Sequence, residues 1–227
     1  MSKIEYFNED CMVGMARYPD KHFDLAIVDP PYGIGECGGD KKRGRKKDNY
    51  KKVVVHEKKY WDNDKPSDDY FDELFRVSKN QIIWGGNYFV DNLYPIMGWI
   101  FWDKLIGGDF SDGELAWTSF DRALRQFTYS YHGDTKGGHT RIHPTQKPVA
   151  LYKWLLTNYA KQGDLILDTH VGSASSLIAC YDLGFDAVGF ELDADYYKAS
   201  KQRLNDFMSQ TRLDDVNNPD WSQLQLL

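Results

Sequence analysis

Cysteine is scarce in this chain, and the three cysteines that are present lie far apart. Cys11, Cys37 and Cys180 show no metal-ligand spacing, and an odd, scattered set builds no disulfide framework. This distribution argues against a small disulfide-rich secreted domain. It favours reduced thiols, so we expect a cytoplasmic protein without a metal site.

Long apolar runs are also missing. No stretch is long enough to cross a bilayer, and residues 1–5 lack the apolar segment of a signal peptide. Hydrophobic residues make up 41% and charged residues 27%, an ordinary globular composition. With 227 residues the chain can form one domain with a substantial core, and we expect no membrane partner.

A general excess of positive charge is absent as well, since the net charge is −6. The distribution is uneven, however: residues 36–59 hold ten lysines and arginines against four acids. A basic segment on an acidic body is compatible with phosphate contact at one surface, although a solvated loop would show the same composition. The candidate contacts to DNA are Lys41, Lys42, Arg43, Lys46 and Lys47.

Apolar runs alternate with helical patterns along the chain, which predicts an α/β fold with a largely parallel sheet. Seven strands are expected, at residues 3–7, 23–28, 81–84, 98–102, 127–131, 165–168 and 187–191. Six helices are expected, at residues 10–15, 67–77, 88–93, 148–160, 175–183 and 193–208. Two segments, 35–65 and 103–141, look largely irregular; loops of that length inside a compact domain are more often functional than accidental.

The first segment that carries chemistry is Asp29-Pro30-Pro31-Tyr32, directly after an apolar strand. A carboxylate can accept a hydrogen bond from an exocyclic amine. Proline has no N–H and a fixed φ, which stiffens the turn and leaves its carbonyl free to accept a second hydrogen bond. Tyr32 offers a flat face to a base. A plain strand stop with a core tyrosine explains these residues equally well when they are taken alone.

The second segment runs from Leu165 to Ser176, where a buried strand enters a small-residue turn and then a helix. Such a turn brings exposed N–H groups close to a ligand. The next strand ends at Glu191, about 20 residues beyond, where an acid can accept ribose hydroxyls. A nucleoside cofactor is therefore indicated, although any α/β protein needs turns of this kind. The fit to Gly-x-Gly-x-x-Gly is poor, so a nicotinamide cofactor is disfavoured.

Together with His143-Pro144-Thr145-Gln146-Lys147-Pro148, a polar segment with no role assignable from its residues alone, these motifs resemble those of the amino-group DNA methyltransferases that use S-adenosylmethionine. The resemblance extends from about Lys3 to Leu204, in the β arrangement, with the catalytic half first. It implies a Rossmann-like methyltransferase fold with helices on both faces of the sheet. It also implies a single catalytic domain spanning residues 1–227, in which the segments 35–65 and 103–141 are candidates for DNA recognition.

The resemblance also assigns roles to residues. Asp29, Pro30, Pro31 and Tyr32 would hold a flipped-out base, with Trp102 covering its second face. The residues implied for the cofactor are Asp10, Cys11, Asp29, Thr145, Gln146, Lys147, Asp168, His170, Gly172, Ser173, Ser175, Glu191 and Leu192. Of these, Asp10 and Cys11 would contact adenine, Glu191 the ribose, and residues 145–147 the methionine end. The turn at residues 83–87 would also line the site.

The cofactor turn departs from the family pattern Phe-x-Gly-x-Gly at two positions. His170 stands where a phenylalanine is usual, and Ala174 stands where a glycine is usual. A histidine ring can still pack, and an alanine fits without strain only if its φ is negative. These two positions would support an alternative of another class, a DNA-binding protein with a decayed cofactor site, although an intact segment from Asp29 to Tyr32 would serve no purpose in a pure binder.

Within the enzyme class, the implied reaction is methylation of the N6 amine of adenine in double-stranded DNA. The alternative is the N4 amine of cytosine, for which a serine is more usual than Asp29 in this family; RNA is a weaker alternative. The recognition sequence, a homodimer and an accompanying restriction enzyme are all left open by the sequence.

Overall fold

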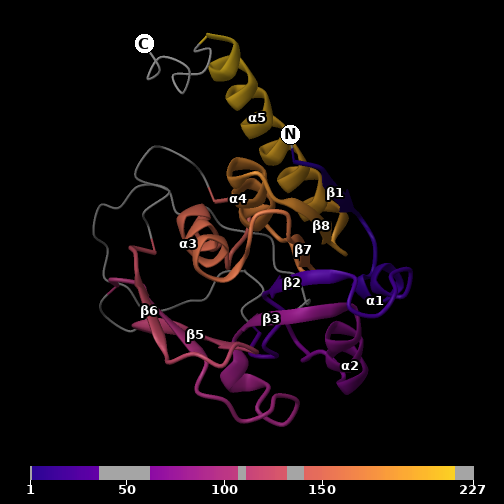
Figure 1. Ribbon diagram of the computed structural model, residues 1–227, viewed down its shortest axis with the longest axis vertical. Coiled ribbons are helices and arrows are strands. Elements are labelled where there is room, and N and C mark those ends of the chain that lie inside the picture. Colours follow the sequence, from indigo (N-terminus) through magenta and orange to yellow (C-terminus); the bar gives the residue numbers. More distant parts are fainter. Residues whose placement is uncertain (1, 36–61, 107–110, 132–140, 218–227) are drawn as a thin grey trace, which may run out of the picture.

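The computed structural model describes residues 2–35, 62–106, 111–131 and 141–217 of the chain, which form a central sheet with helices on both faces (Figure 1). The strands are β1 (Ile4–Phe7), β2 (Phe23–Val28), β3 (Ser78–Trp84), β4 (Trp99–Asp103), β5 (Gly113–Thr118), β6 (Arg125–Thr128), β7 (Leu165–Asp168) and β8 (Asp186–Phe190). The helices are α1 (Cys11–Met15), α2 (Asp68–Val77), α3 (Val149–Tyr159), α4 (Ser175–Leu183) and α5 (Ala194–Asn217), with a 3₁₀ turn η1 (Gly86–Tyr88).

The sheet has the order β1-β8-β7-β2-β3-β5-β4-β6. The strands β1, β8, β7, β2 and β3 are all parallel to one another. Strand β5 is antiparallel to both of its neighbours, and β6 is parallel to β4. The expected Rossmann-like architecture is thus confirmed. Among the described residues, no helix has the length and apolar character that a membrane crossing needs.

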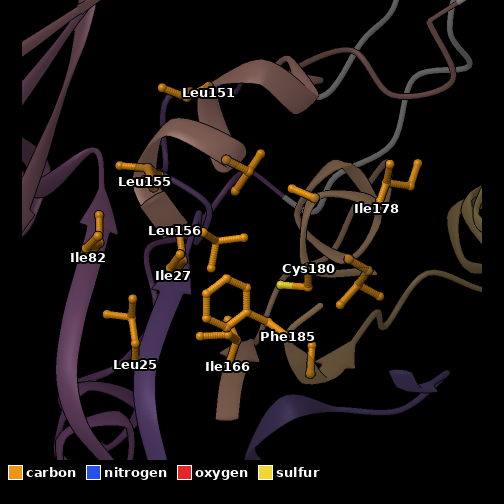
Figure 2. Packing of buried hydrophobic residues seen from close by; sticks show 14 of the residues in the cluster. Leu25, Ile27, Ile82, Leu151, Leu155, Leu156, Ile166, Ile178, Cys180 and Phe185 are labelled. Atoms are coloured by element: carbon orange, nitrogen blue, oxygen red, sulfur yellow. The ribbon is translucent and has the colours of Figure 1, made fainter. Parts of the chain in front are cut away.

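The two faces of the sheet carry separate cores. In β2, Leu25 and Ile27 face the core under α3 and α4, whereas Ala26 and Val28 face the core under α1 and α2. A strand buried on both faces reads as a continuous apolar run, as expected for parallel pairing. Figure 2 shows the first of these cores, where leucines of α3, the Phe185 ring and Cys180 of α4 close over β2, β3 and β7.

The helix ends follow the local sequence. Asp68 and Asp69 lie in the first turn of α2 and Arg76 in its last, so each charge complements the helix dipole. Gly184 ends α4 with φ of +78°, a left-handed conformation that glycine adopts without strain.

Two expectations about the elements are wrong. Within the described residues the sheet has eight strands rather than seven, because residues 113–118 of the segment expected to be irregular form β5. This strand lies inside the sheet, between β3 and β4, so its pairing partners come from distant parts of the chain. The helix expected at residues 88–93 is only the short turn η1 followed by further turns, in which the N–H of Asn92 bonds the carbonyl of Phe89 three residues earlier.

The strand order indicates where a ligand site would lie. The chain moves from β7 through α4 to β8 in one direction along the sheet, and from β2 through α2 to β3 in the other. The carboxyl ends of the neighbouring strands β2 and β7 therefore flank a topological switch point, where ligands bind in open α/β sheets. Asp29 follows β2, and Asp168 ends β7.

Candidate active site

The loop after β2 is held from outside by one buried carboxylate. Oδ1 of Asp62 accepts hydrogen bonds from the backbone N–H groups of Tyr32, at 2.7 Å, and Gly33, at 3.0 Å. Its carbonyl accepts a third, from the N–H of Gly35. Asp62 is 2% exposed, so the turn that carries Asp29 and Tyr32 is fixed before any ligand arrives.

Both oxygens of the Asp29 carboxylate are occupied. The Tyr32 hydroxyl donates to Oδ1 at 2.7 Å, and Nζ of Lys147 lies 2.5 Å from Oδ2. Burial raises the pKa of Asp29, the Lys147 ammonium opposes the rise, and the charge of Glu114 adds to it. The site thus holds a carboxylate in a half-enclosed position, with 17% of its side chain exposed.

The Tyr32 ring stacks on Tyr88, with centroids 4.9 Å apart and planes inclined by 16°. Gly85 lies against the same ring, and a Cβ there would lie 2.2 Å from Tyr32 Cε1. Gly85 also has φ of +68°. Both facts require glycine at this position, and they confirm that the turn at residues 83–87 lies beside Tyr32.

The second motif forms a turn between β7 and α4. Asp168 is 2% exposed; it accepts hydrogen bonds from the Ser176 hydroxyl and, at 3.0 Å, from the His170 N–H. Burial raises its pKa to about 7, and the charges of Asp29 and Glu191 contribute to the rise. The carboxyl groups of Asp29, Asp168 and Glu191 are therefore within electrostatic range of one another.

Glu191 closes this turn from the end of β8. Its Oε2 accepts the Gly172 N–H at 2.8 Å, and its Oε1 accepts the Asp193 N–H at 2.9 Å. Gly172 has φ of +54°. The strand-turn-strand arrangement expected from the sequence is present, with Glu191 joining its two ends.

The two departures from the family pattern have different consequences. Burial lowers the pKa of His170 to about 4, so its ring is neutral, and it packs edge-on against Tyr70. Ala174, in contrast, has φ of +62° and is fully buried. The condition of a negative φ is not met, so this position stores backbone strain that a glycine would not have.

The other residues implied for the cofactor lie around this turn. Asp10 caps α1 by accepting the Met12 N–H, and Cys11 follows with a pKa raised by burial to about 12. Leu192 is 70% exposed beside Glu191. Ser173 and Ser175 are buried and bonded to each other, and Arg203 of α5 donates to the Ser173 carbonyl and the Ser175 hydroxyl. These two serines therefore serve the internal structure of the turn.

The segment from His143 to Pro148 connects the two motifs. The His143 ring lies 3.7 Å from where a Cβ on Gly172 would be, while Lys147 binds Asp29. Thr145 bonds the His143 ring, and the Gln146 side chain accepts the Ile142 N–H, which fixes the segment's shape. Lys147 was expected at the methionine end of the cofactor; in the structure its ammonium binds the Asp29 carboxylate, and its place relative to the cofactor stays a prediction.

One expected substrate contact is wrong. Trp102 is fully buried, and its indole N–H donates to the Tyr129 carbonyl at 2.9 Å. It belongs to the core beside Trp84, so it cannot cover a flipped base. Lys41, Lys42, Arg43, Lys46 and Lys47 lie outside the described residues.

Sequence reasoning also missed two residues of this site. Asp62 lies at the edge of the basic segment and Glu114 on the unexpected strand β5, and neither stands in a motif. Their roles are seen only in their contacts with residues far away in the chain, Tyr32 and Gly33 for Asp62 and Lys147 for Glu114. Among the described residues, no group of three or more His, Cys, Asp or Glu side chains is placed to hold a metal ion.

Comparisons with known proteins agree with this geometry. A DNA methylase family model, of N6 and N4 methyltransferases, matches residues 41–202. The Type II methyltransferase M.HpaI of Haemophilus parainfluenzae is 24% identical over 82% of this chain and 69% of its own length. The putative methylase YubD of Escherichia coli K12 is 23% identical over 88% of this chain and 89% of its own.

Solved structures share the fold. The M1.HpyAVI–SAM complex covers 88% of this chain and 99% of its own, with a TM-score of 0.58 and 17% identity. The cytosine-N4-specific PvuII DNA methyltransferase covers 92% of this chain and 93% of its own, with a TM-score of 0.56 and 13% identity. Since the family match, residues 41–202, extends over more than half of the chain and includes the ends of β7 and β8, this chain belongs to the family of amino-group DNA methylases, the N6/N4 methyltransferases.

Proposed function

We propose that this protein transfers a methyl group from S-adenosylmethionine to the exocyclic N6 amine of an adenine that is flipped out of double-stranded DNA. The observation that supports this most directly is the placement of Asp29, on a turn held by Asp62, beside the strand whose end carries Asp168. A carboxylate that can accept a hydrogen bond from the substrate amine and a turn suited to a nucleoside cofactor thus lie at the same topological switch point.

The charges of the cofactor turn fit S-adenosylmethionine, which carries a sulfonium and an ammonium. Asp168 and Glu191 hold the two ends of the turn, and no ion pair to Asp168 is found within the described part of the chain. A cationic ligand would relieve the mutual repulsion of these acids. When bound, the cofactor supplies an activated methyl group.

The chain's own residues would prepare the base. Removing a base from the stack costs a few kcal/mol, which stacking on Tyr32 and hydrogen bonds to Asp29 and the Pro30 carbonyl would offset. Two acceptors on the amine hydrogens favour a pyramidal nitrogen with a localised lone pair. That nitrogen would bond to the methyl carbon in line as the carbon–sulfur bond breaks, leaving S-adenosylhomocysteine, and one amine proton would pass to solvent. Alignment of the two groups would supply much of the rate.

Cytosine N4 is the second candidate. It is favoured by the similarity to the PvuII enzyme, whereas Asp29, rather than the serine more usual for cytosine, favours adenine. Labelled methyl transfer to mixed DNA, followed by digestion and weighing of the nucleosides, separates the two. N6-methyl-2′-deoxyadenosine in the digest supports the proposal, whereas N4-methyl-2′-deoxycytidine alone would overturn it.

Within the proposed single domain, the segments 35–65 and 103–141 are the candidates for DNA recognition. Neutralising Lys41, Lys42, Arg43, Lys46 and Lys47 together should weaken DNA binding and flatten its salt dependence. An unchanged salt slope would exclude these side chains from the DNA contact.

The role of Asp29 has its own test. Asp29→Asn should lower the rate of methyl transfer by about a thousandfold. The uncharged amide is a weaker hydrogen-bond acceptor than the carboxylate, its NH₂ group is a donor, and it forms no ion pair with Lys147. Binding of S-adenosylmethionine, measured by calorimetry, should persist. Near-normal turnover in this variant would remove Asp29 from the mechanism.

A further inference from the structure

Four charged side chains of alternating sign extend from the active site into the sheet. Asp29 contacts Lys147, Lys147 also contacts Glu114, and Glu114 contacts Lys104. The two acids come from the end of β2 and from β5, and Lys104 follows β4. The row therefore ties the proposed catalytic carboxylate to the antiparallel part of the sheet.

Lys147 is the shared member of the row. Its Nζ lies 2.5 Å from Asp29 Oδ2 and 3.0 Å from Glu114 Oε2. Its side chain is 3% exposed, and its Nζ lies 5.3 Å from the centre of the Trp84 ring and 5.8 Å from that of Tyr32. Because the ammonium is enclosed by rings and carboxylates, it has few other positions to adopt.

The sharing has an electrostatic consequence for Asp29. An ammonium bound to one carboxylate alone would neutralise it and weaken it as a hydrogen-bond acceptor. Because Glu114 also binds the Lys147 ammonium, that positive charge is shared between two carboxylates and neutralises Asp29 less completely. The Oε2 atom of Glu114 is buried and accepts no well-directed hydrogen bond from the described residues, so the attraction to Lys147 there is ionic.

We propose that Glu114 is a positioning residue for methyl transfer: it holds Lys147 between two carboxylates and so keeps Asp29 a strong acceptor for the substrate amine. This inference rests on the proposed function of Asp29. Glu114 touches neither base nor cofactor in this account, and it acts only through Lys147.

Other titratable groups face the same row. The Tyr32 hydroxyl bonds Asp29, and Tyr152 of α3 and Asp168 of β7 lie within electrostatic range of it. Burial raises the pKa of both tyrosines, so these remain neutral and do not replace either carboxylate. Burial acts to lower the pKa of Lys147, yet the two acids outweigh it and raise that pKa, so the ammonium persists.

The test compares pH profiles of the maximal rate. Glu114→Gln removes a negative neighbour from Asp29 and leaves Lys147 to Asp29 alone. The acid limb should therefore move down by about one pH unit while the plateau falls about tenfold. Lys147→Gln removes the cation, so the acid limb should move up by about one pH unit or more. Shifts in opposite directions are not expected from a general loss of folded protein.

A matched control is Glu73→Gln, which removes one carboxylate from the ion pair with Arg76 on α2. It should leave the profile where it is. A second readout needs no cofactor: carbon-13 NMR titration of the aspartate carboxyls should show a lower pKa for Asp29 in Glu114→Gln. If that variant does not fold, Glu114→Asp, which keeps the charge but shortens its reach, should lower the plateau without moving the NMR titration.

The outcomes are separable. If wild-type protein methylates DNA but Glu114→Gln changes neither the pH profile nor the NMR titration, the role of Glu114 is overturned and the proposed function stands. If wild-type protein methylates no nucleic acid, the proposed function itself fails. A plateau that falls by the same factor at every pH in Glu114→Gln, with no shift of the acid limb, would also overturn the role of Glu114.

Discussion

The hydroxyl of Tyr32 donates a hydrogen bond of 2.7 Å to Oδ1 of Asp29, three residues earlier in the same turn. Lys147 occupies the other oxygen. In the protein without substrate, the tyrosine hydroxyl therefore stands where an amine N–H of the base would bind. Under the proposed function the base would displace this hydroxyl, and the ring of Tyr32 would serve as the stacking surface.

This relationship predicts different effects for two substitutions of Tyr32. Tyr32→Phe keeps the ring and frees Oδ1, so kcat/KM should stay within about tenfold of wild type. Tyr32→Ala removes the stacking surface, which is worth about 1–3 kcal/mol per base, so kcat/KM should fall by about ten- to a hundredfold. Steady-state methylation of DNA measures both. Equal losses in the two variants would show that the hydroxyl, not the ring, is what the reaction needs.

The raised pKa of Asp168 predicts a pH-dependent cofactor affinity. With a pKa of about 7 in the protein alone, Asp168 is largely protonated at pH 6 and ionised at pH 8. A cationic ligand binds the ionised form better, so the dissociation constant for S-adenosylmethionine should fall about tenfold between these pH values. Calorimetry measures this, and Asp168→Asn should make the affinity nearly independent of pH. The same slope in the asparagine variant would assign the effect to another group.

Glu191 is predicted to serve both the turn and the cofactor. The two carboxylate oxygens of Glu191 accept hydrogen bonds from the backbone N–H groups of Gly172 and Asp193. Glu191→Gln replaces one of these oxygens with an NH₂ group, which would face a backbone N–H that it cannot bond. The free energy of unfolding should fall by about 1–3 kcal/mol, and the cofactor affinity should fall at least about tenfold. Thermal unfolding and calorimetry measure the two effects.

Asp186→Asn is the control for this variant, because Asp186 begins the same strand at its other end. It should leave the cofactor affinity unchanged. Loss of stability without any loss of affinity in Glu191→Gln would restrict Glu191 to a structural role.

The strain at Ala174 predicts a stabilising substitution. Ala174→Gly removes a left-handed alanine, which costs about 1–2 kcal/mol, but it adds about 0.5–1 kcal/mol of unfolded-chain entropy. We expect a net gain of up to about 1 kcal/mol, or a melting temperature about 2–4 °C higher. Differential scanning calorimetry measures this.

The reverse change provides the matched control. Gly184 has φ of +78°, and a Cβ there would meet only the Gln162 amide, at an ordinary 3.6 Å. Gly184→Ala should therefore destabilise the protein by about 1 kcal/mol through backbone strain alone. If Ala174→Gly also lowers the melting temperature, the buried methyl group of Ala174 contributes more than its strain costs.

Much of the fold is readable from local sequence, and the reason is physical. The apolar runs of β2, β7 and β8 are buried on both faces, so their composition alone distinguishes them from surface segments. The turn before α4 and the acid at Glu191 follow from the backbone needs of a strand-turn-helix unit. The family resemblance then identified Asp29 and Glu191 as candidate site residues.

The strand β5 shows where local reasoning ends. It begins with Gly113 and Glu114, which have little strand preference, and nothing in its own sequence indicates that β3 and β4 enclose it. Trp102 shows the opposite error. An aromatic residue at a strand end suggests a ligand surface, yet the packing of Trp84 and Tyr131 around it makes it core.

By itself, the sequence determined the alternation of strands and helices and the motifs on which the family resemblance rests, because each of these is a short segment whose residues are close together in the chain. Only the tertiary structure decided that Lys147, 118 residues from Asp29, lies between that carboxylate and Glu114. Ion contacts and burial depend on which distant segments the sheet brings together. The charge state of the proposed catalytic carboxylate is therefore a property of the folded protein and not of its motif.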